Sequence, residues 1–353
     1  MRPSVQQPYA GIFVINQFNK LAQMEGKYSV ELFSMERTFT GIAGSIIKYF
    51  IAVLRFIPFL FRKYDIVHVH YFYPFVALAV LYKSFHRNAM VVATFHGTDI
   101  TVRIRYSLSR SIYARLARKA DFLIAVSNEI AREIENKLSI RPHLVMCAGV
   151  DSGVFFKKNN IEKKYDFIFA ASFSHRKGAD ILIEAIRLVG EKNIRYCIAG
   201  TGIYRDEFYK LKADFNLDVL AGQNQNQLCE LFNASRFLIL PSRNEPFGLV
   251  VTEAMYCGTP VIVSHRGGLK EQVTENINGF FLYENTPEEL AEKIISVMNL
   301  SMDEYQKLSL HALNSNKQFS LDEICRSTIG IYKNLLRPDK KNSNTEHFAF
   351  GTK

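Results

Sequence analysis

Two glutamates eight residues apart, Glu245 and Glu253, are the side chains whose placement points most directly to chemistry. An apolar run of buried-strand length, residues 236–242, precedes Glu245, and a helix predicted to begin near Pro246 and Phe247 carries Glu253. Open α/β sheets bind ligands at the carboxyl ends of parallel strands. Because carboxylates accept hydrogen bonds in pairs, the two glutamates suit the hydroxyl groups of a sugar and a ribose.

The predicted helix start between these glutamates suits an anion. The backbone N–H groups of Phe247, Gly248 and Leu249 lie at this start, where unpaired N–H groups and the helix dipole favour a diphosphate. A nucleotide sugar has hydroxyls on either side of a diphosphate and fits the arrangement. In the competing interpretation, Glu245 caps the helix and Glu253 is an exposed helical residue. This segment alone does not decide between the two interpretations.

Three histidines form a second group. His68 and His70 alternate on one face of a predicted strand, and His96 follows another strand. With Asp99 they could be read as metal ligands. The competing interpretation, which we favour, places them at strand ends in the core without a metal.

The elements that position these residues alternate between short apolar runs and amphipathic segments, which predicts a parallel sheet in an α/β fold. Helices are predicted at 128–138 and 178–189, and a last one after Ser320, with Glu323 completing a capping box. Strands are predicted at 65–71, 90–95, 121–127, 144–150, 166–172, 195–200, 236–242 and 260–264.

The alternation of predicted strands and helices is interrupted by a polar, lysine-rich stretch from Asp151 to Tyr165. We place the domain boundary there. The predicted division is a first domain at 1–150, a second at 151–319, a terminal helix at 320–337 and a disordered tail at 338–353.

The ordered set of motifs resembles the retaining family 4 glycosyltransferases, whose GT-B fold has two Rossmann-like domains facing across a cleft. The resemblance extends over most of the chain, and the order of the motifs is more specific than any one of them. They are DIVHVHY at 65, TFHGTD at 94, AVSNEI at 125, GVDSGVF at 149, HRKGADILIEA at 175, AGTG at 199, EPFGLVVTEAMYCGTPVI at 245, and GGLKE at 267 followed by NGFFL at 278.

The resemblance implies roles for individual residues. Glu245 would hold donor-sugar hydroxyls and Glu253 the nucleotide ribose. Lys177 would bind the donor diphosphate, and His96 would meet the transferred sugar near the acceptor. Without the resemblance, Lys177 reads as a solvent-facing turn residue.

The resemblance also assigns weaker positions. Gly200 and Gly202 would lie near the nucleotide, and Gly11 would face the donor. Ser172 stands where the family has a second phosphate-binding arginine, so diphosphate binding by the second domain would either be weaker or fall to Arg176. The pair Gly267 and Gly268 would let a loop approach the donor, or would form a plain turn.

Composition describes a water-soluble globular protein of 353 residues with 48% hydrophobic and 22% charged residues, which excludes collagen, coiled coil and disorder. Residues 1–150 contain 19 Lys and Arg against 9 Asp and Glu, whereas residues 151–353 contain 25 of each. The first half is therefore expected to meet something anionic, unless it is simply a solvated basic face. Five cysteines without a Cys-x-x-Cys pair favour a reduced, cytoplasmic compartment.

The most apolar stretch, residues 41–62, contains Lys48, Arg55 and Pro58, which argue against a membrane-spanning helix. A basic, aromatic-rich helix suits the membrane interface, and the alternative is a helix packed on the sheet with its cations reaching solvent. The residues after Met1 do not resemble a signal peptide, since polar Gln6 and Gln7 stand where an apolar core is expected.

Family members open with an apolar strand, whereas this sequence begins in the loop that carries Gly11. The first domain is therefore expected to lack its first strand. We favour a start codon placed too far downstream over a genuinely short product.

The resulting expectation is a retaining, metal-independent hexosyltransferase that uses a nucleoside diphosphate sugar and no cofactor. Its acceptor would be a saccharide or a lipid-linked saccharide in surface polysaccharide or lipopolysaccharide assembly. The enzyme would be cytoplasmic, in peripheral contact with an anionic membrane, and would not bind nucleic acid. The alternatives are an inactive, truncated GT-B remnant, a nucleotide-sugar epimerase, and a metal-dependent hydrolase built on the histidines.

Overall fold

The computed structural model describes residues 11–24, 28–35, 41–101 and 107–337. These residues form two compact units. Of the described residues, unit 1 contains those within 17–147 and 323–337, and unit 2 contains 11–16 and 148–322. The predicted tail at 338–353 lies outside the described residues.

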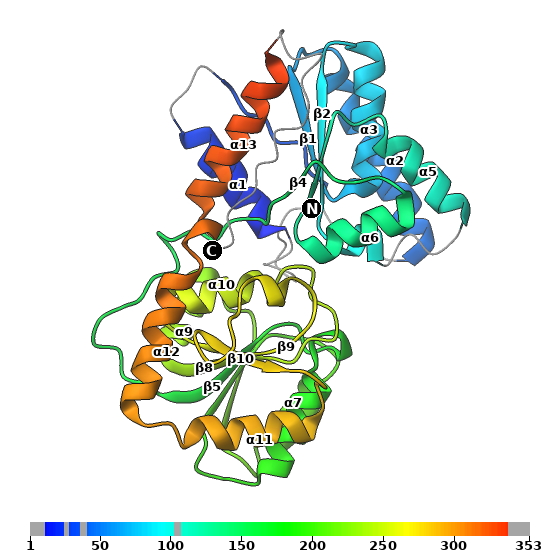
Figure 1. The fold of residues 1–353 in the computed structure, drawn as a ribbon. Coiled ribbons are helices and arrows are strands. Elements are labelled where there is room, and N and C mark those ends of the chain that lie inside the picture. The colour runs from blue at the N-terminus through cyan, green and yellow to red at the C-terminus, as the bar shows by residue number, and fades with distance from the viewer. Residues whose placement is uncertain (1–10, 25–27, 36–40, 102–106, 338–353) are drawn as a thin grey trace. The chain divides into compact units, whose positions relative to one another are not determined.

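Unit 1 is built on a parallel sheet with the strand order β1-β2-β3-β4 (Figure 1). Parallel neighbours require crossover connections, and helices supply most of them here. The strands are β1 (Ile66–His70), β2 (Met90–Phe95), β3 (Phe122–Ala125) and β4 (Leu144–Val145). The helices are α2 (Gly41–Leu60), α3 (Phe72–Phe85), α4 (Thr98–Thr101), α5 (Ser107–Ala117) and α6 (Asn128–Leu138), together with most of α1 (Ile12–Gln23) and most of α13 (Leu321–Leu336).

Unit 2 is a six-stranded, fully parallel sheet with the order β10-β9-β8-β5-β6-β7. Helices α7 and α11 cover one face, and α9, α10 and α12 cover the other (Figure 1). The strands are β5 (Tyr165–Ala170), β6 (Tyr196–Ala199), β7 (Leu217–Leu220), β8 (Ser235–Leu240), β9 (Val261–Ser264) and β10 (Gly279–Leu282). The helices are α7 (Ala179–Val189), α8 (Arg205–Leu211), α9 (Gln225–Asn233), α10 (Leu249–Tyr256), α11 (Pro287–Met298) and α12 (Met302–Ser315).

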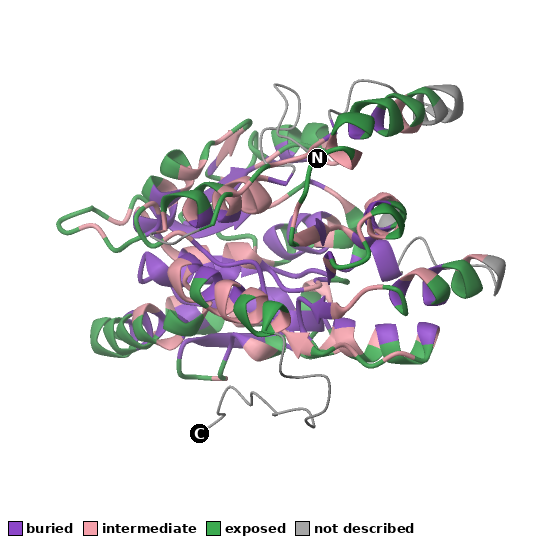
Figure 2. Ribbon diagram, turned by 90° about the horizontal axis from the view of Figure 1, so that it is seen from above, coloured by how far each residue is buried: buried purple, intermediate pink, exposed green. Residues whose placement is uncertain are grey.

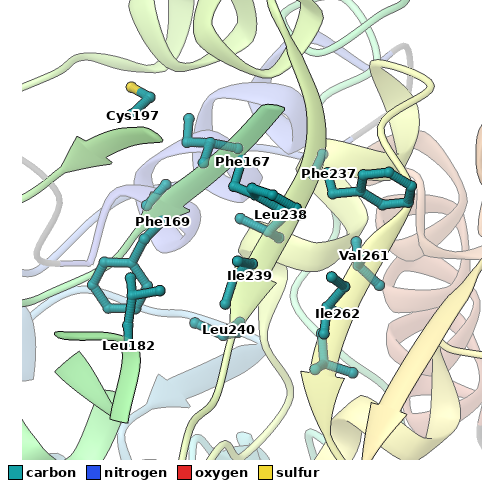
Figure 3. Close-up of a cluster of buried hydrophobic side chains, with 14 of the residues drawn as sticks. Phe167, Phe169, Leu182, Cys197, Phe237, Leu238, Ile239, Leu240, Val261 and Ile262 are labelled. Carbon is teal, nitrogen blue, oxygen red and sulfur yellow. The ribbon is translucent and has the colours of Figure 1, made fainter. Parts of the chain in front are cut away.

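The core of unit 2 explains why its strands read as continuous apolar runs. All six residues of β5 are buried, as are the last four of β8, because helices cover both faces of the sheet. Phe167, Phe169 and Phe237 pack with aliphatic side chains of β8, β9 and α7 (Figure 3). This rigid layer fixes the strand ends from which the site residues extend.

The structure differs from the predicted elements in several places. Strands β7 and β10 were not predicted, because each has only four residues at an edge of the sheet; Asp218 interrupts the apolar pattern of β7, and β10 has only three apolar residues after Gly279. The strand predicted at 144–150 is confined to two residues. In the described residues ahead of β1 there are the helices α1 and α2 and no strand.

Helix α2 contains Pro58. Within the part of the chain that the structure describes, no helix is long and apolar enough to cross a membrane.

Candidate functional site

Lys177 and Glu245 meet at the point where the strand order of unit 2 reverses. From β5 the chain proceeds to β6 on one side, whereas β8 lies on the other side of β5. The carboxyl end of β5 leads to the 3₁₀ turn His175–Lys177, and that of β8 leads to Glu245. A doubly wound sheet opens a crevice for ligands at such a switch point.

The two side chains form a buried ion pair. The ammonium group of Lys177 contacts Oε2 of Glu245, and the side chains are 14% and 7% exposed. The Ser242 hydroxyl donates to the same carboxylate oxygen at 3.3 Å. A buried charge is costly unless it is paired and hydrogen-bonded, so this arrangement holds both ionised groups at the strand ends.

Arg243 fixes the loop that carries Glu245 against the turn that carries Lys177. Its guanidinium donates two bonds of 2.7 Å to the Asp180 carboxylate and one of 2.7 Å to the His175 carbonyl. Its backbone N–H donates to the Arg176 carbonyl at 2.9 Å. Sequence reasoning missed Arg243, because its partners lie more than sixty residues earlier in the chain.

Arg176, the predicted second diphosphate contact, is exposed. One of its guanidinium nitrogens donates to the Asn244 carbonyl at 3.3 Å. The guanidinium therefore lies beside the loop of Glu245, with most of its donors directed to solvent.

The anion-binding helix begins later than predicted. Helix α10 starts at Leu249, because Gly248 has φ +91°, a left-handed conformation that ends the preceding loop. Phe247 therefore precedes the helix, and its N–H does not belong to the first turn. The first N–H groups of a helix lack partners within it, so Leu249 and the residues after it supply the anion site predicted here.

Gln272 holds this helix start in place. Its amide nitrogen donates to the Phe247 carbonyl at 2.5 Å, and its amide oxygen accepts from Thr252 on α10 at 2.6 Å. Gln272 is 3% exposed. A buried amide that joins a loop to the helix after it makes the loop rigid. No spacing rule in the sequence pointed to this residue.

Gly267 and Gly268 let a second loop approach the backbone of Glu245. The N–H of Gly268 donates to the Glu245 carbonyl at 3.0 Å. A Cβ on Gly267, whose φ is +58°, would lie 1.8 Å from that oxygen, and one on Gly268 would lie 2.6 Å from Cα of Phe247. The structure therefore gives this pair a contact with the glutamate loop.

Glu253 lies inside α10, eight residues beyond Glu245, and is half-buried. Burial raises the pKa of its carboxyl group to about 7. A carboxyl in such surroundings gains from hydrogen-bond donors, and paired ribose hydroxyls are donors of this kind.

The remaining predicted glycines of unit 2 lie close to backbone. Gly200 and Gly202 follow β6 and pack against the carbonyl oxygens of Ala171 and Phe173, in the loop after β5. Gly11 is buried at the start of α1, and its carbonyl accepts from Val14 N–H at 3.0 Å.

In unit 1, His96 belongs to a stacked group of histidines. His96 Nε2 lies 3.2 Å from His70 Nδ1, and His68 Nδ1 lies 2.6 Å from the Tyr332 hydroxyl on α13. His68 Nε2 also lies 2.8 Å from the Thr94 hydroxyl. Neighbouring parallel strands bring the three rings together, since β1 pairs with β2 in register.

The histidines are neutral. Burial lowers the pKa of His70 to about 4, and burial followed by the neighbouring rings holds the pKa values of His68 and His96 well below their usual range. In a neutral pair, one ring donates and the other accepts. The tautomer of His96 is therefore tied to that of His70.

Asp99 fixes the loop of His96. Its Oδ2 accepts from the N–H groups of Phe72 at 2.9 Å and His96 at 3.2 Å, which joins the ends of β1 and β2. Burial raises the pKa of Asp99. Among the described residues, no three His, Cys, Asp or Glu side chains form a group that could hold a metal ion.

Two sequence-family models match consecutive parts of the chain. The sequence model of Glycosyltransferase Family 4 matches residues 24–152, and that of Glycosyl transferases group 1 matches residues 151–314. An uncharacterized glycosyltransferase of Methanocaldococcus jannaschii is 28% identical over 77% of this chain and 76% of its own length. The N-acetyl-alpha-D-glucosaminyl L-malate synthase of Bacillus anthracis is 26% identical over 78% and 76%.

Solved structures agree on the fold. The chain is similar to HepE of Anabaena, solved with UDP and glucose, with a TM-score of 0.68, 19% identity and coverage of 80% and 82% of the two chains. It is similar to sucrose-phosphate synthase of Thermosynechococcus elongatus, with a TM-score of 0.67, 20% identity and coverage of 82% and 78%. The architecture is GT-B, and the chain belongs to family 4 of the glycosyltransferases.

Proposed function

We propose that this glycosyltransferase is a hexosyltransferase that moves a sugar from a nucleoside diphosphate to a saccharide or lipid-linked acceptor, with retention at the anomeric carbon. The observation that carries the proposal is the buried pair of Lys177 and Glu245 at the switch point of unit 2. Lys177 supplies positive charge for the leaving diphosphate, and Glu245 accepts from donor-sugar hydroxyls.

Electrostatics provides the rate enhancement in this proposal. As the bond to the sugar breaks, negative charge grows on the diphosphate, and fixed donors stabilise it without reorganising. These donors are Lys177, Arg176 and the first turn of α10. They do the work that a divalent ion does elsewhere, so the reaction needs neither a metal nor an organic cofactor.

Relatives support a nucleotide donor. HepE was solved with UDP and glucose, and D-inositol 3-phosphate glycosyltransferases are 24–29% identical to this chain. A protein from the cps region of Klebsiella pneumoniae is 25% identical over 86% of this chain and 89% of its own length. Our proposal includes surface polysaccharide assembly as the context, on the cytoplasmic side of the membrane and without nucleic acid as a partner.

The test is a thermal-shift panel of nucleoside diphosphates and nucleotide sugars. A ligand that binds only the folded protein raises the melting temperature, so we expect one nucleotide family to stabilise the chain. The stabilising nucleotide sugar is then incubated with candidate acceptors, and the anomeric configuration of the product is read by NMR. Stabilisation by no nucleotide would favour an inactive remnant, and an inverted product would refute retention.

A further inference from the structure

We propose that the outer face of α2 docks onto the surface of an anionic lipid bilayer. The inference concerns a face of unit 1 outside the site described above, and it is tested without donor or acceptor. Exposed positions outnumber buried ones in residues 47–60 of α2 (burial is coloured in Figure 2), although the helix is among the most apolar segments of the chain.

An apolar stripe runs along the exposed side of α2. Its members are spaced by three, four, three and four residues, which places them on one side of a helix. Phe50 is 64% exposed and Phe61, just beyond the helix end, is 84% exposed. The stripe consists of Ile47, Phe50, Leu54, Ile57 and Phe61, and Ile51 and Val53 flank it.

The opposite side of α2 attaches the helix to its unit. Phe56 is buried in a small cluster with Tyr82 of α3, and it packs edge-on against Phe33. The Leu60 carbonyl accepts from His86 at 2.8 Å, and the Arg62 carbonyl accepts from Tyr82 at 2.9 Å. This attachment leaves the side chains of the apolar stripe exposed.

The positive charges beside the stripe indicate that this face binds an anionic surface. Lys48, Arg55 and Arg62 recur every seven residues, which aligns them beside the stripe, and residues 41–63 contain no Asp or Glu. Arg62 is paired with exposed Glu31 at 2.7 Å, a surface pair that contributes little. A second copy of this helix would add more cations and no acidic side chain to pair them, whereas anionic headgroups match them.

The physical chemistry of an interfacial helix fits this face. Such a helix buries its apolar side at the level of the headgroups, and its cations contact anionic lipid. Each cation near an anionic surface contributes about fivefold in affinity. Partial burial of several large apolar side chains contributes more than about tenfold.

The experiment is flotation with vesicles of phosphatidylcholine alone and of phosphatidylcholine with phosphatidylglycerol. We expect the full chain to float with the anionic vesicles, and salt to weaken its binding. The triple variant Phe50→Ser, Leu54→Ser, Ile57→Ser should bind at least about tenfold more weakly. Its melting temperature should be preserved, because all three side chains are exposed.

A matched triple variant controls for lost apolar surface in general. Ile112→Ser, Leu188→Ser and Leu310→Ser replace side chains of similar exposure on α5, α7 and α12, and this variant should float like the original chain. For charge, Lys48→Gln with Arg55→Gln should weaken binding, whereas Arg115→Gln with Arg118→Gln, two exposed positions at the end of α5, should not.

Three results would overturn the inference. The first is an original chain that ignores anionic vesicles, and the second is an α2 triple variant that binds them unchanged. The third is a dimer that the α2 triple variant converts to a monomer in sedimentation, which would assign the face to a second copy. Failure of the nucleotide panel would leave the flotation result standing, so the two proposals fail separately.

Discussion

The ammonium group of Lys177 and the carboxylate of Glu245 form an ion pair across 68 residues of sequence, at the ends of two neighbouring strands. A donor diphosphate arriving at this point competes with Glu245 for the lysine. Release of the carboxylate toward sugar hydroxyls would then accompany donor binding. This exchange makes the pair the most informative place for mutation.

Replacing Glu245 by Gln should lower turnover by about a hundredfold or more, because a neutral amide loses the charged hydrogen bonds to the reacting sugar. Nucleotide affinity should be retained or rise, since the diphosphate no longer competes with a carboxylate for Lys177. Steady-state kinetics and calorimetry measure the two quantities. Glu292→Gln, on the exposed side of α11, is the matched control. Unchanged turnover in Glu245→Gln would remove the assigned role.

Replacing Lys177 by Met should destabilise unit 2 by about 3–5 kcal/mol, because Glu245 is left buried without its counter-ion. The double variant Lys177→Met, Glu245→Gln should recover part of this loss, since the uncompensated charge is gone. Urea unfolding of both single variants and the double variant completes the cycle. The control variant Lys192→Met, at an exposed position, should leave the free energy of unfolding unchanged. Additive single effects would mean that the contact has no energetic coupling.

Protonation of the histidine group should destabilise the protein in acid. The pKa of His70 is lowered to about 4, so between about pH 6.5 and 4 the unfolded chain binds a proton that the native state does not. Stability should therefore fall as pH decreases through this window, by about 1.4 kcal/mol per pH unit for each such histidine at most.

The variant His70→Gln isolates this contribution. Its melting temperature should fall less steeply than that of the original chain between pH 7 and 5, whereas exposed His311→Gln should follow the original curve. Parallel curves for the original chain and His70→Gln would contradict a neutral, buried His70.

Glu253 should produce the opposite trend. Its pKa is raised to about 7, so between about pH 4.5 and 7 the native state holds a proton that the unfolded chain has lost. Its contribution to stability falls as pH rises through this window, by about 3 kcal/mol in total at most. Glu253→Gln should remove the decline in thermal melts from pH 5 to 8.

Donor binding should also release protons near pH 7 if ribose hydroxyls donate to the Glu253 carboxylate. Calorimetry in buffers of different ionisation enthalpy detects such release. A nucleotide sugar is the right ligand, because its diphosphate does not titrate there. Equal heats in all buffers, or the same release from Glu253→Gln, would place the ribose elsewhere.

Gly267→Ala should disrupt the site more than an ordinary glycine substitution. The new Cβ would meet the Glu245 carbonyl at 1.8 Å, so the glutamate loop must move, and we expect a loss of about 3 kcal/mol or more with weaker nucleotide binding. Gly222→Ala is a close control, because Gly222 has φ +67° but nothing within 4 Å of the new Cβ. It should cost about 1–2 kcal/mol. Equal losses would show that backbone strain alone is responsible.

The sequence by itself determined the fold class. Short apolar runs that alternate with amphipathic segments bury their apolar residues when the runs form a parallel sheet and the segments form helices that cover it. It also indicated the positions of Glu245, Glu253 and Lys177, because motifs at strand ends are local in sequence. Local patterns also placed helix α6 at Asn128–Leu138. Short edge strands such as β7 were missed because their patterns are too brief to stand out.

Only the tertiary structure decided which of these residues touch. The pairing of Lys177 with Glu245 depends on β5 lying beside β8, and the bond between Tyr332 and His68 spans 264 residues. Gln272 can hold the start of α10 only because the fold brings its side chain to the Phe247 carbonyl, 25 residues away in sequence. Such contacts depend on strand order and packing, which many sequences of the same pattern could satisfy differently, so they cannot be read from spacing.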